Sequence, residues 1–384
     1  MPANTADEEV KKARAAFERR TYDAAIAHCK SALTFVDKEA TGATAQRQRA
    51  GILLLLSEIT DVTGQWVDSL LYLDGVTQIS VALSDTKLAV ESLIQAGKII
   101  SKKGKWEDAL RKFERAEQLS RKQGIHRLLG RALIGKGTIL WRQSQHVDAA
   151  HEAESAAKIG DNIGDIQMQG GAHALMASIR FDQGNYAASV EANEKALKLF
   201  ETIKDAYEMA RVLNNLGETF RAMGNLPEAV KRLEACLKIS EESGNNRNAG
   251  YALMNIADCK IRLGDPPGAK VAAIKADAIF SSLEDKYAKA NISMVWGLIH
   301  SARGEIKNAR SCFDRALETM SALAIPYDLG IIQLEYGRFL VRGDASDEGP
   351  AMLKRAIHSF ELAGAKEMMA RAKKELDASG GIQS

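Results

Sequence analysis

The sequence predicts an all-α fold in which antiparallel helix pairs follow one another as a solenoid. The main observation is a repeat: a glycine two positions before an apolar or aromatic residue recurs with a constant 40-residue period, and Ser144 stands in the one slot skipped between Gly64 and Gly304. Composition agrees, because 30 glycines and only 6 prolines suit many helices joined by short glycine turns. The repeating glycines are Gly64, Gly104, Gly184, Gly224, Gly264 and Gly304.

Each repeat is predicted to hold two helices. A second series of glycines falls half a period after the first and marks the turn that follows the second helix. Helices of about 14–16 residues with connections of about four residues fit this spacing. Small residues recur seven residues before each first turn, where they let the two helices approach closely. The second glycines are Gly124, Gly164, Gly244 and Gly364, and the small residues are Ser57, Gly97, Gly137, Ala177, Gly217, Ala257, Gly297 and Gly337.

The repeat divides the chain, in order, into nine helix pairs and a closing helix. The first repeat, residues 5–48, is longer than the others, and its roughly four extra residues are expected in a loop at 38–44. Eight repeats of about 40 residues follow over 49–363, and a charged capping helix is expected at 365–378. Length alone favours two or three domains of about 150 residues. The unbroken repeat instead predicts a single solenoid domain over residues 1–384.

The net charge and the length of the apolar runs limit the kinds of partner that the sequence predicts. The chain has 52 basic and 50 acidic residues, a net charge of +2, which gives no electrostatic reason to expect nucleic acid. The longest apolar run, Ile52–Leu56, is far shorter than the about 20 residues that span a bilayer. The polar start has no secretory signal, and four scattered cysteines are expected to be buried and reduced. We therefore expect a cytoplasmic protein that does not insert into membranes.

Motifs of catalysis, metal binding and cofactor binding are absent from the sequence. His151 and Glu152 resemble the start of a metalloprotease motif, but Ser155 stands where the second histidine belongs. His146 and His151 are five residues apart and do not share a helix face. The glycine-bounded stretch 160–164 is preceded by a helix, whereas a phosphate loop follows a strand. The sequence predicts no enzymatic activity, cofactor or metal.

The repeating positions resemble the tetratricopeptide repeat (TPR), which alternates small, glycine and aromatic residues at fixed positions of two helices. The period of 40 instead of 34 is similar to that of Pins-type adaptors and of the sensor regions of maltose-regulator-type activators. The resemblance implies a right-handed superhelix in which the first helix of each pair lines a concave groove. Two repeats carry the pattern as Gly97, Ile100, Gly104, Trp106, Ala109, Phe113 and Ala116, and as Gly217, Phe220, Gly224, Leu226, Ala229, Leu233 and Cys236.

In the TPR frame, six positions of each first helix point into the groove. Asn215 and Asn255 share one slot in neighbouring repeats, so their amides are suited to bind the backbone of an extended peptide. Arg211, Arg221 and Arg262 are suited to pair with a carboxylate. The frame also places Glu58, Lys98, Asn291 and Arg338 in the groove. The expected partner-binding residues are Arg131, Trp141, Arg142, Arg211, Asn214, Asn215, Glu218, Arg221, Tyr251, Asn255, Asp258 and Arg262.

The favoured function is a non-enzymatic scaffold or adaptor that binds a peptide or a partner helix in the concave groove. A long groove gains affinity from many small contacts along an extended chain. The alternative is a ligand-sensing or regulatory TPR module that controls an associated effector. A third class is an accessory subunit of an enzyme, and self-association through the end repeats is also open.

Overall fold

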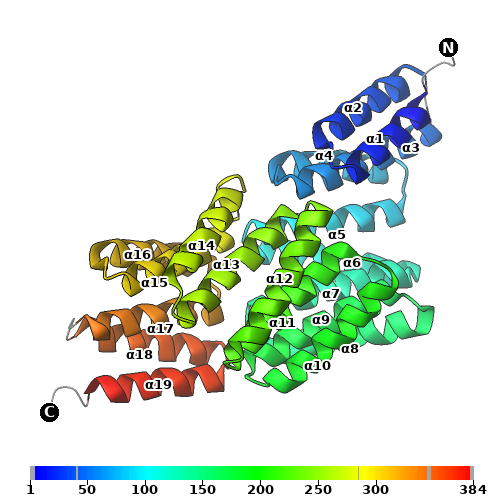
Figure 1. Cartoon of the computed structure of the whole chain (residues 1–384). Helices are drawn as coiled ribbons and strands as arrows, with labels where there is room; N and C mark the ends of the chain where they lie inside the picture. Colours follow the sequence, from blue (N-terminus) through cyan, green and yellow to red (C-terminus); the bar gives the residue numbers. More distant parts are fainter. Residues whose placement is uncertain (1–4, 40–41, 284, 344–346, 381–384) are drawn as a thin grey trace. The chain divides into compact units, whose positions relative to one another are not determined.

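The computed structural model describes residues 5–39, 42–283, 285–343 and 347–380, and every regular element within them is an α-helix. Short turns join the helices, so consecutive helices run antiparallel and pack as pairs (Figure 1). None of the described helices is long and apolar enough to cross a membrane. The predicted all-α, TPR-like solenoid of helix pairs is confirmed. The helices are α1 (Ala6–Glu18), α2 (Tyr22–Glu39), α3 (Ala43–Val62), α4 (Trp66–Ala82), α5 (Thr86–Lys102), α6 (Trp106–Gln123), α7 (His126–Arg142), α8 (His146–Ile163), α9 (Ile166–Asp182), α10 (Tyr186–Thr202), α11 (Ala206–Ala222), α12 (Leu226–Ser243), α13 (Asn246–Arg262), α14 (Pro266–Ser281), α15 (Lys286–Ala302), α16 (Ile306–Leu323), α17 (Pro326–Arg342), α18 (Glu348–Leu362) and α19 (Lys366–Gly380).

A residue in the left-handed conformation lies in the turn after one helix and before the next. From Gly64 to Gly364, every described first-turn and second-turn slot of the repeat has a positive φ. The slots at 284 and 344 lie outside the described residues. Ser144, where the glycine is missing, has a φ of 62°, so the turn keeps its geometry without glycine. Three second-turn slots also lack glycine and also have a positive φ, namely Ser84, Lys204 and Ala324.

Small residues allow the two helices of a pair to approach closely. A Cβ built at Gly217 of α11 would lie 2.5 Å from the Leu233 Cγ of α12. At Gly97 of α5, a Cβ would lie 2.9 Å from the Phe113 ring of α6. Leu233 and Phe113 are fully buried. The apolar core therefore runs between the helices of each pair and depends on these small residues.

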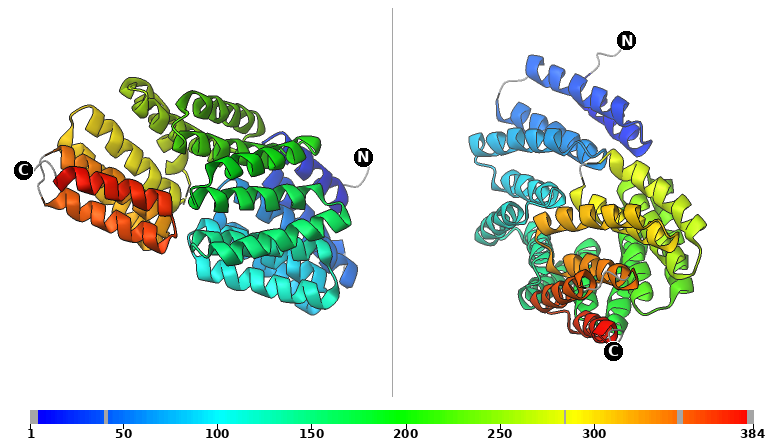
Figure 2. Two further views of the ribbon diagram at one scale, coloured as in Figure 1. Left: turned by 90° about the horizontal axis from the view of Figure 1, so that it is seen from below. Right: turned by 90° about the vertical axis from the view of Figure 1, so that its left-hand side faces the viewer.

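The chain groups into two compact units, residues 1–136 and 137–384, and the boundary lies within α7. In the first unit, the apolar core joins α1 to α5. In the second unit, each odd-numbered helix from α9 to α17 contacts the next odd-numbered helix. Figure 2 shows the helices from two further sides. We call α9, α11, α13, α15, α17 and α19 the inner helices, because their side chains line the cavity described below.

The two ends of the repeat array differ from its middle. Helix α3 has 20 residues and α5 has 17, so part of the extra length of the first repeat lies in a helix. Residues 40 and 41 of the predicted loop at 38–44 lie outside the described residues. The closing helix α19 occupies Lys366–Gly380, where the capping helix is predicted.

Replacing Ala324 by glycine is expected to raise the free energy of unfolding by about 0.5–1 kcal/mol, because glycine adopts the positive φ of this turn without a Cβ penalty. Ala324 is exposed, so no packing is lost. Chemical denaturation measures the change. The matched control, Ala278→Gly at an exposed site inside α14, should destabilise by about 1 kcal/mol. A loss of stability in Ala324→Gly would contradict the interpretation.

Candidate functional site

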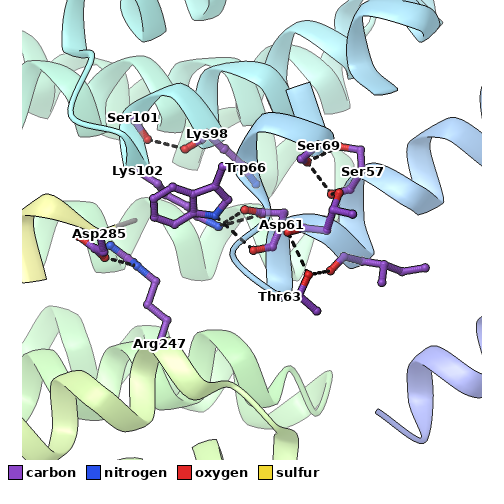
Figure 3. A network of polar contacts seen from close by, with 12 residues as sticks. Ser57, Asp61, Thr63, Trp66, Ser69, Lys98, Ser101, Lys102, Arg247 and Asp285 are labelled. Carbon is purple, nitrogen blue, oxygen red and sulfur yellow. Dashed lines mark hydrogen bonds and ion pairs between the residues drawn. The ribbon is translucent and has the colours of Figure 1, made fainter. Parts of the chain in front are cut away.

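In the first unit, a polar network links α3 to α4 and α5 (Figure 3). Lys102 Nζ donates to both carboxylate oxygens of Asp61, at 2.7 and 2.8 Å. Trp66 Nε1 donates to the Asp61 carbonyl oxygen at 3.3 Å. Ser69 Oγ donates to the Ser57 carbonyl oxygen at 2.7 Å. Asp61 therefore connects α3 both to α4, the other helix of its pair, and to α5, the next odd-numbered helix.

The link between Asp61 and Lys102 belongs to a series in which polar groups of successive odd-numbered helices meet at a sequence offset of 41. The geometry follows from stacking helices of nearly equal length in register. A second series has an offset of 37 or 38 and includes the Arg247–Asp285 pair at 2.7 Å (Figure 3). In the second unit, the pairs of the first series are Trp141 with Asp182, Tyr207 with Asn248, Asn214 with Asn255, and Tyr287 with Asp328.

A cavity of about 150 Å³ lies among the inner helices of the second unit, and all six of them contribute side chains to its wall. The wall combines aromatic rings, guanidinium groups, carboxylates and a few aliphatic side chains. Arginines and carboxylates are present in equal number, so charge alone does not select the sign of a ligand. The aromatic and charged lining residues are Phe181, Glu218, Arg221, Tyr251, Asp258, Arg262, Tyr287, Tyr327, Asp328, Glu335, Arg338 and Arg371.

The structure brings half of the twelve predicted binding residues to this cavity. Asn291 and Arg338, which the TPR frame also places in the groove, line it too. Of the remainder, Arg131 lies in the first unit, and Arg211 is paired with Glu208 on its own helix. The predicted residues that line the cavity are Glu218, Arg221, Tyr251, Asn255, Asp258 and Arg262. Those that do not are Arg131, Trp141, Arg142, Arg211, Asn214 and Asn215.

Asn255 is paired with Asn214 instead of with Asn215. Its Nδ2 donates to Asn214 Oδ1 at 3.0 Å and to Glu218 Oε1 at 2.9 Å. Both N–H groups of the amide are therefore used inside the protein, and Asn255 is only 6% exposed. The offset between these two inner helices is 41, one more than the repeat period, so residues in the same slot of the repeat do not face each other.

Asp258 is the most enclosed carboxylate of the cavity wall, with 3% exposure. Its Oδ2 lies 2.7 Å from Arg221 Nη1, and its Oδ1 accepts from Arg262 Nε at 2.9 Å. Burial by itself would raise the pKa of Asp258, but the two arginines outweigh burial and hold the pKa below its ordinary value. Arg262 continues to Glu335 of α17 at 3.0 Å. One chain of ion pairs thus joins α11, α13 and α17.

Arg142 is held between two rings and a carboxylate. Its guanidinium carbon lies 4.3 Å from the ring centroid of Trp141 and 4.7 Å from that of Tyr287. Its Nη1 lies 3.5 Å from Asp328 Oδ2. Burial raises the pKa of Asp328 to about 6, although Arg142 opposes this shift. The pairing with rings and a carboxylate compensates the buried guanidinium for its lost hydration.

Three residues of the cavity wall were not predicted from the sequence. Tyr287 lies in the first helical turn of α15, and Tyr327 and Asp328 lie in the first helical turn of α17. The 34-residue frame, counted back from the turn glycine, begins at residue 290 in this repeat. Helix α15 begins at Lys286, because the longer repeat extends the helix by about one turn. Tyrosine recurs at 207, 287 and 327, at whole multiples of the repeat period. This recurrence in the sequence could have identified the first helical turn of these helices as part of the cavity wall.

Asp258→Asn is expected to lower the free energy of unfolding by about 2–4 kcal/mol at neutral pH, because it leaves two arginines without their shared carboxylate. A lowered pKa stabilises the fold above the unfolded pKa of about 4, so the difference from wild type should shrink as pH falls below that value. Denaturation at several pH values checks this. Asp277→Asn, an exposed site on α14, is the control and should change little. A pH-independent difference would refute the electrostatic explanation.

Solved structures share this fold over nearly their whole length. A Rap protein complexed with competence and sporulation factor has a TM-score of 0.60 at 14% identity, covering 97% of this chain and 99% of that one. The Rap conjugation gene regulator of plasmid pLS20, in complex with the Phr* peptide, has a TM-score of 0.62 at 13% identity, covering 93% and 95%. Aspartyl phosphate phosphatase F from Bacillus subtilis has a TM-score of 0.56 at 14% identity, covering 95% and 96%. Identities this low show a common fold alone.

Sequence comparison gives the family. No curated protein sequence matches the chain at a significant level. The family model described as the MalT-like TPR region matches residues 9–273, which is more than half of the chain. This agrees with the resemblance that the 40-residue period indicates. The chain therefore belongs to the family of MalT-like TPR regions.

Proposed function

We propose that this chain is a regulatory TPR module that binds a peptide or a partner helix along the inner helices of its second unit. The observation that carries the proposal is the composition of the cavity wall. Tyrosine and arginine are enriched among the few residues that carry most of the binding energy at protein interfaces, and here both types converge on the cavity from successive odd-numbered helices. The residues are Tyr251, Tyr287 and Tyr327, with Arg221, Arg262, Arg338 and Arg371.

The polar wall suits a peptide. A peptide presents carbonyl acceptors and N–H donors along its length, and it can use guanidinium donors and carboxylate acceptors together. Aromatic rings between these groups can cover its apolar side chains. A protein of the same fold was solved in complex with the Phr* peptide, which supports this class of ligand.

We also propose that the module acts in the cytoplasm as an adaptor or as the regulator of an effector, without catalysis or nucleic-acid binding. Burial raises the pKa of the free thiols Cys29, Cys259 and Cys236 to about 11, 11 and 12, and inert thiols support a reducing compartment. The likeness to a phosphatase is one of fold, and it transfers no activity. That the whole chain is a single solenoid domain stays a prediction, as does self-association.

The test is selection of binding peptides from a displayed random library on the full chain. For a selected peptide, Arg262→Glu is expected to weaken affinity by about ten- to a hundredfold, since it reverses a charge on the cavity wall. Isothermal titration calorimetry measures the affinity, and thermal denaturation shows that the variant is folded. Arg355→Glu, an exposed site on α18, is the matched control. Failure to select any peptide, or equal loss in both variants, would refute the proposal.

A further inference from the structure

The last helices of the second unit return to contact its first helices. Figure 1 shows one end of α19 next to the adjoining ends of α10 and α11. The end of α7, together with α9 and α11, meets α17 and α19. The contacts that join them include an ion pair, a ring contact and a hydrogen bond. Arg142 Nη1 lies 3.5 Å from Asp328 Oδ2, the rings of Phe181 and Tyr327 meet edge to face at 6.0 Å, and Arg371 Nη2 donates to the Ala222 carbonyl oxygen at 3.2 Å.

Such contacts are not a property of an open solenoid, in which each repeat touches only its neighbours. The two polar contacts span 186 and 149 residues. A further approach lies at the turn before α10, where a Cβ built at Gly184 would be 2.8 Å from Glu367 Oε2 of α19. The second unit is therefore closed on itself through contacts between helices that lie far apart in the sequence.

The closed arrangement leaves little room for a ligand. The cavity holds about 150 Å³, whereas pockets that enclose ligands usually hold about 300–1,000 Å³. Met368 and Arg371 of α19 form part of its wall. A peptide can bind along the inner helices only if α17 and α19, which close the cavity, move away from α9 and α11.

We propose that the contacts of Arg142, Phe181 and Ala222 with Asp328, Tyr327 and Arg371 are a latch that holds the second unit in a closed, binding-incompetent state. Binding a peptide requires release of the latch, so the latch regulates the site of the proposed function and this inference rests on that function. A ligand that binds only the open state shifts the population toward it.

The chemistry of the latch suits reversible release. Arg371 donates to the carbonyl of Ala222, the last residue of α11, where the helix itself provides no partner. Water can replace such a donor when the helices part. Glu367 pairs with Arg371 one helical turn away, so the guanidinium keeps a partner in both states. Opening takes Phe181 away from the apolar cluster of α17, α18 and α19, whereas the contacts within each helix pair are kept.

A pair of cysteines tests the closed state. In Gly184→Cys with Glu367→Cys, the two Cβ atoms start 3.0 Å apart and need a small shift to reach the about 3.8 Å of a disulfide. We expect complete cross-linking under mild oxidation, read by mass spectrometry. Gly264→Cys with Glu367→Cys is the matched control, because Gly264 has nearly the same φ and no atom within 4 Å. Equal cross-linking in both pairs, or none in the first, would overturn the closed state.

The rate at which a cysteine in the cavity is labelled tests release of the latch, with neither a ligand nor the engineered disulfide present. Met294 lines the cavity and is 7% exposed. In the Met294→Cys background, a maleimide that carries a polyethylene glycol chain should react about tenfold faster after Arg371→Ala, because the open fraction rises. N-ethylmaleimide reports local reactivity, and Lys373→Ala, an exposed site on α19, is the control. The same rate with and without Arg371 would overturn the latch.

The selected peptide then separates the two proposals. It should bind the oxidised Gly184→Cys, Glu367→Cys protein about tenfold more weakly than the reduced form, because the disulfide holds the second unit closed. Equal affinities would overturn the regulation while the peptide-binding function stands. If no peptide is selected, the proposed function fails, and the cross-linking and labelling rates still decide the latch.

Discussion

The constraint on which the rest of the structure depends is a left-handed residue at each half-period slot of the repeat that the structure describes from Gly64 to Gly364. It ends one helix and starts the next at the same interval along the repeat array, so helices of nearly equal length stack in register. Ser144 and Lys204 show that the backbone keeps this conformation where glycine is absent. The packing of the array supplies the energy that holds these two residues in a disfavoured region.

Because the helices stack in register, the contacts within a helix pair differ in chemistry from the contacts between successive odd-numbered helices. Between the helices of a pair, glycines and alanines admit rings and branched side chains, and most of the contact is apolar. Between successive odd-numbered helices, hydrogen bonds and ion pairs recur at offsets close to one repeat period. Apolar contacts stabilise each pair, whereas directional polar contacts fix how one pair is placed on the next. The same polar layer forms the cavity wall, so stability and recognition use the same side chains.

The sequence is most informative where local chemistry determines structure. The helix pairs and turns were predictable, because glycine and small residues mark positions that have no other good solution. The Asn255–Asn214 pair was not, because a one-residue offset between stacked helices depends on how they cross. Tyr287 and Tyr327 fell outside a motif frame that is shorter than the helix. Contacts such as Arg371 with Ala222 depend on curvature summed over several repeats, which no local pattern records.

The return of α19 to α11 has a consequence for how this chain can evolve. Open solenoids gain and lose whole repeats readily, because each added unit offers the same surface as the one it displaces. In the second unit, one extra or missing helix pair between α11 and α19 would carry Arg371 past the Ala222 carbonyl or leave it short. Closure therefore fixes the repeat number there, and divergence must proceed by exchange of side chains instead of by duplication.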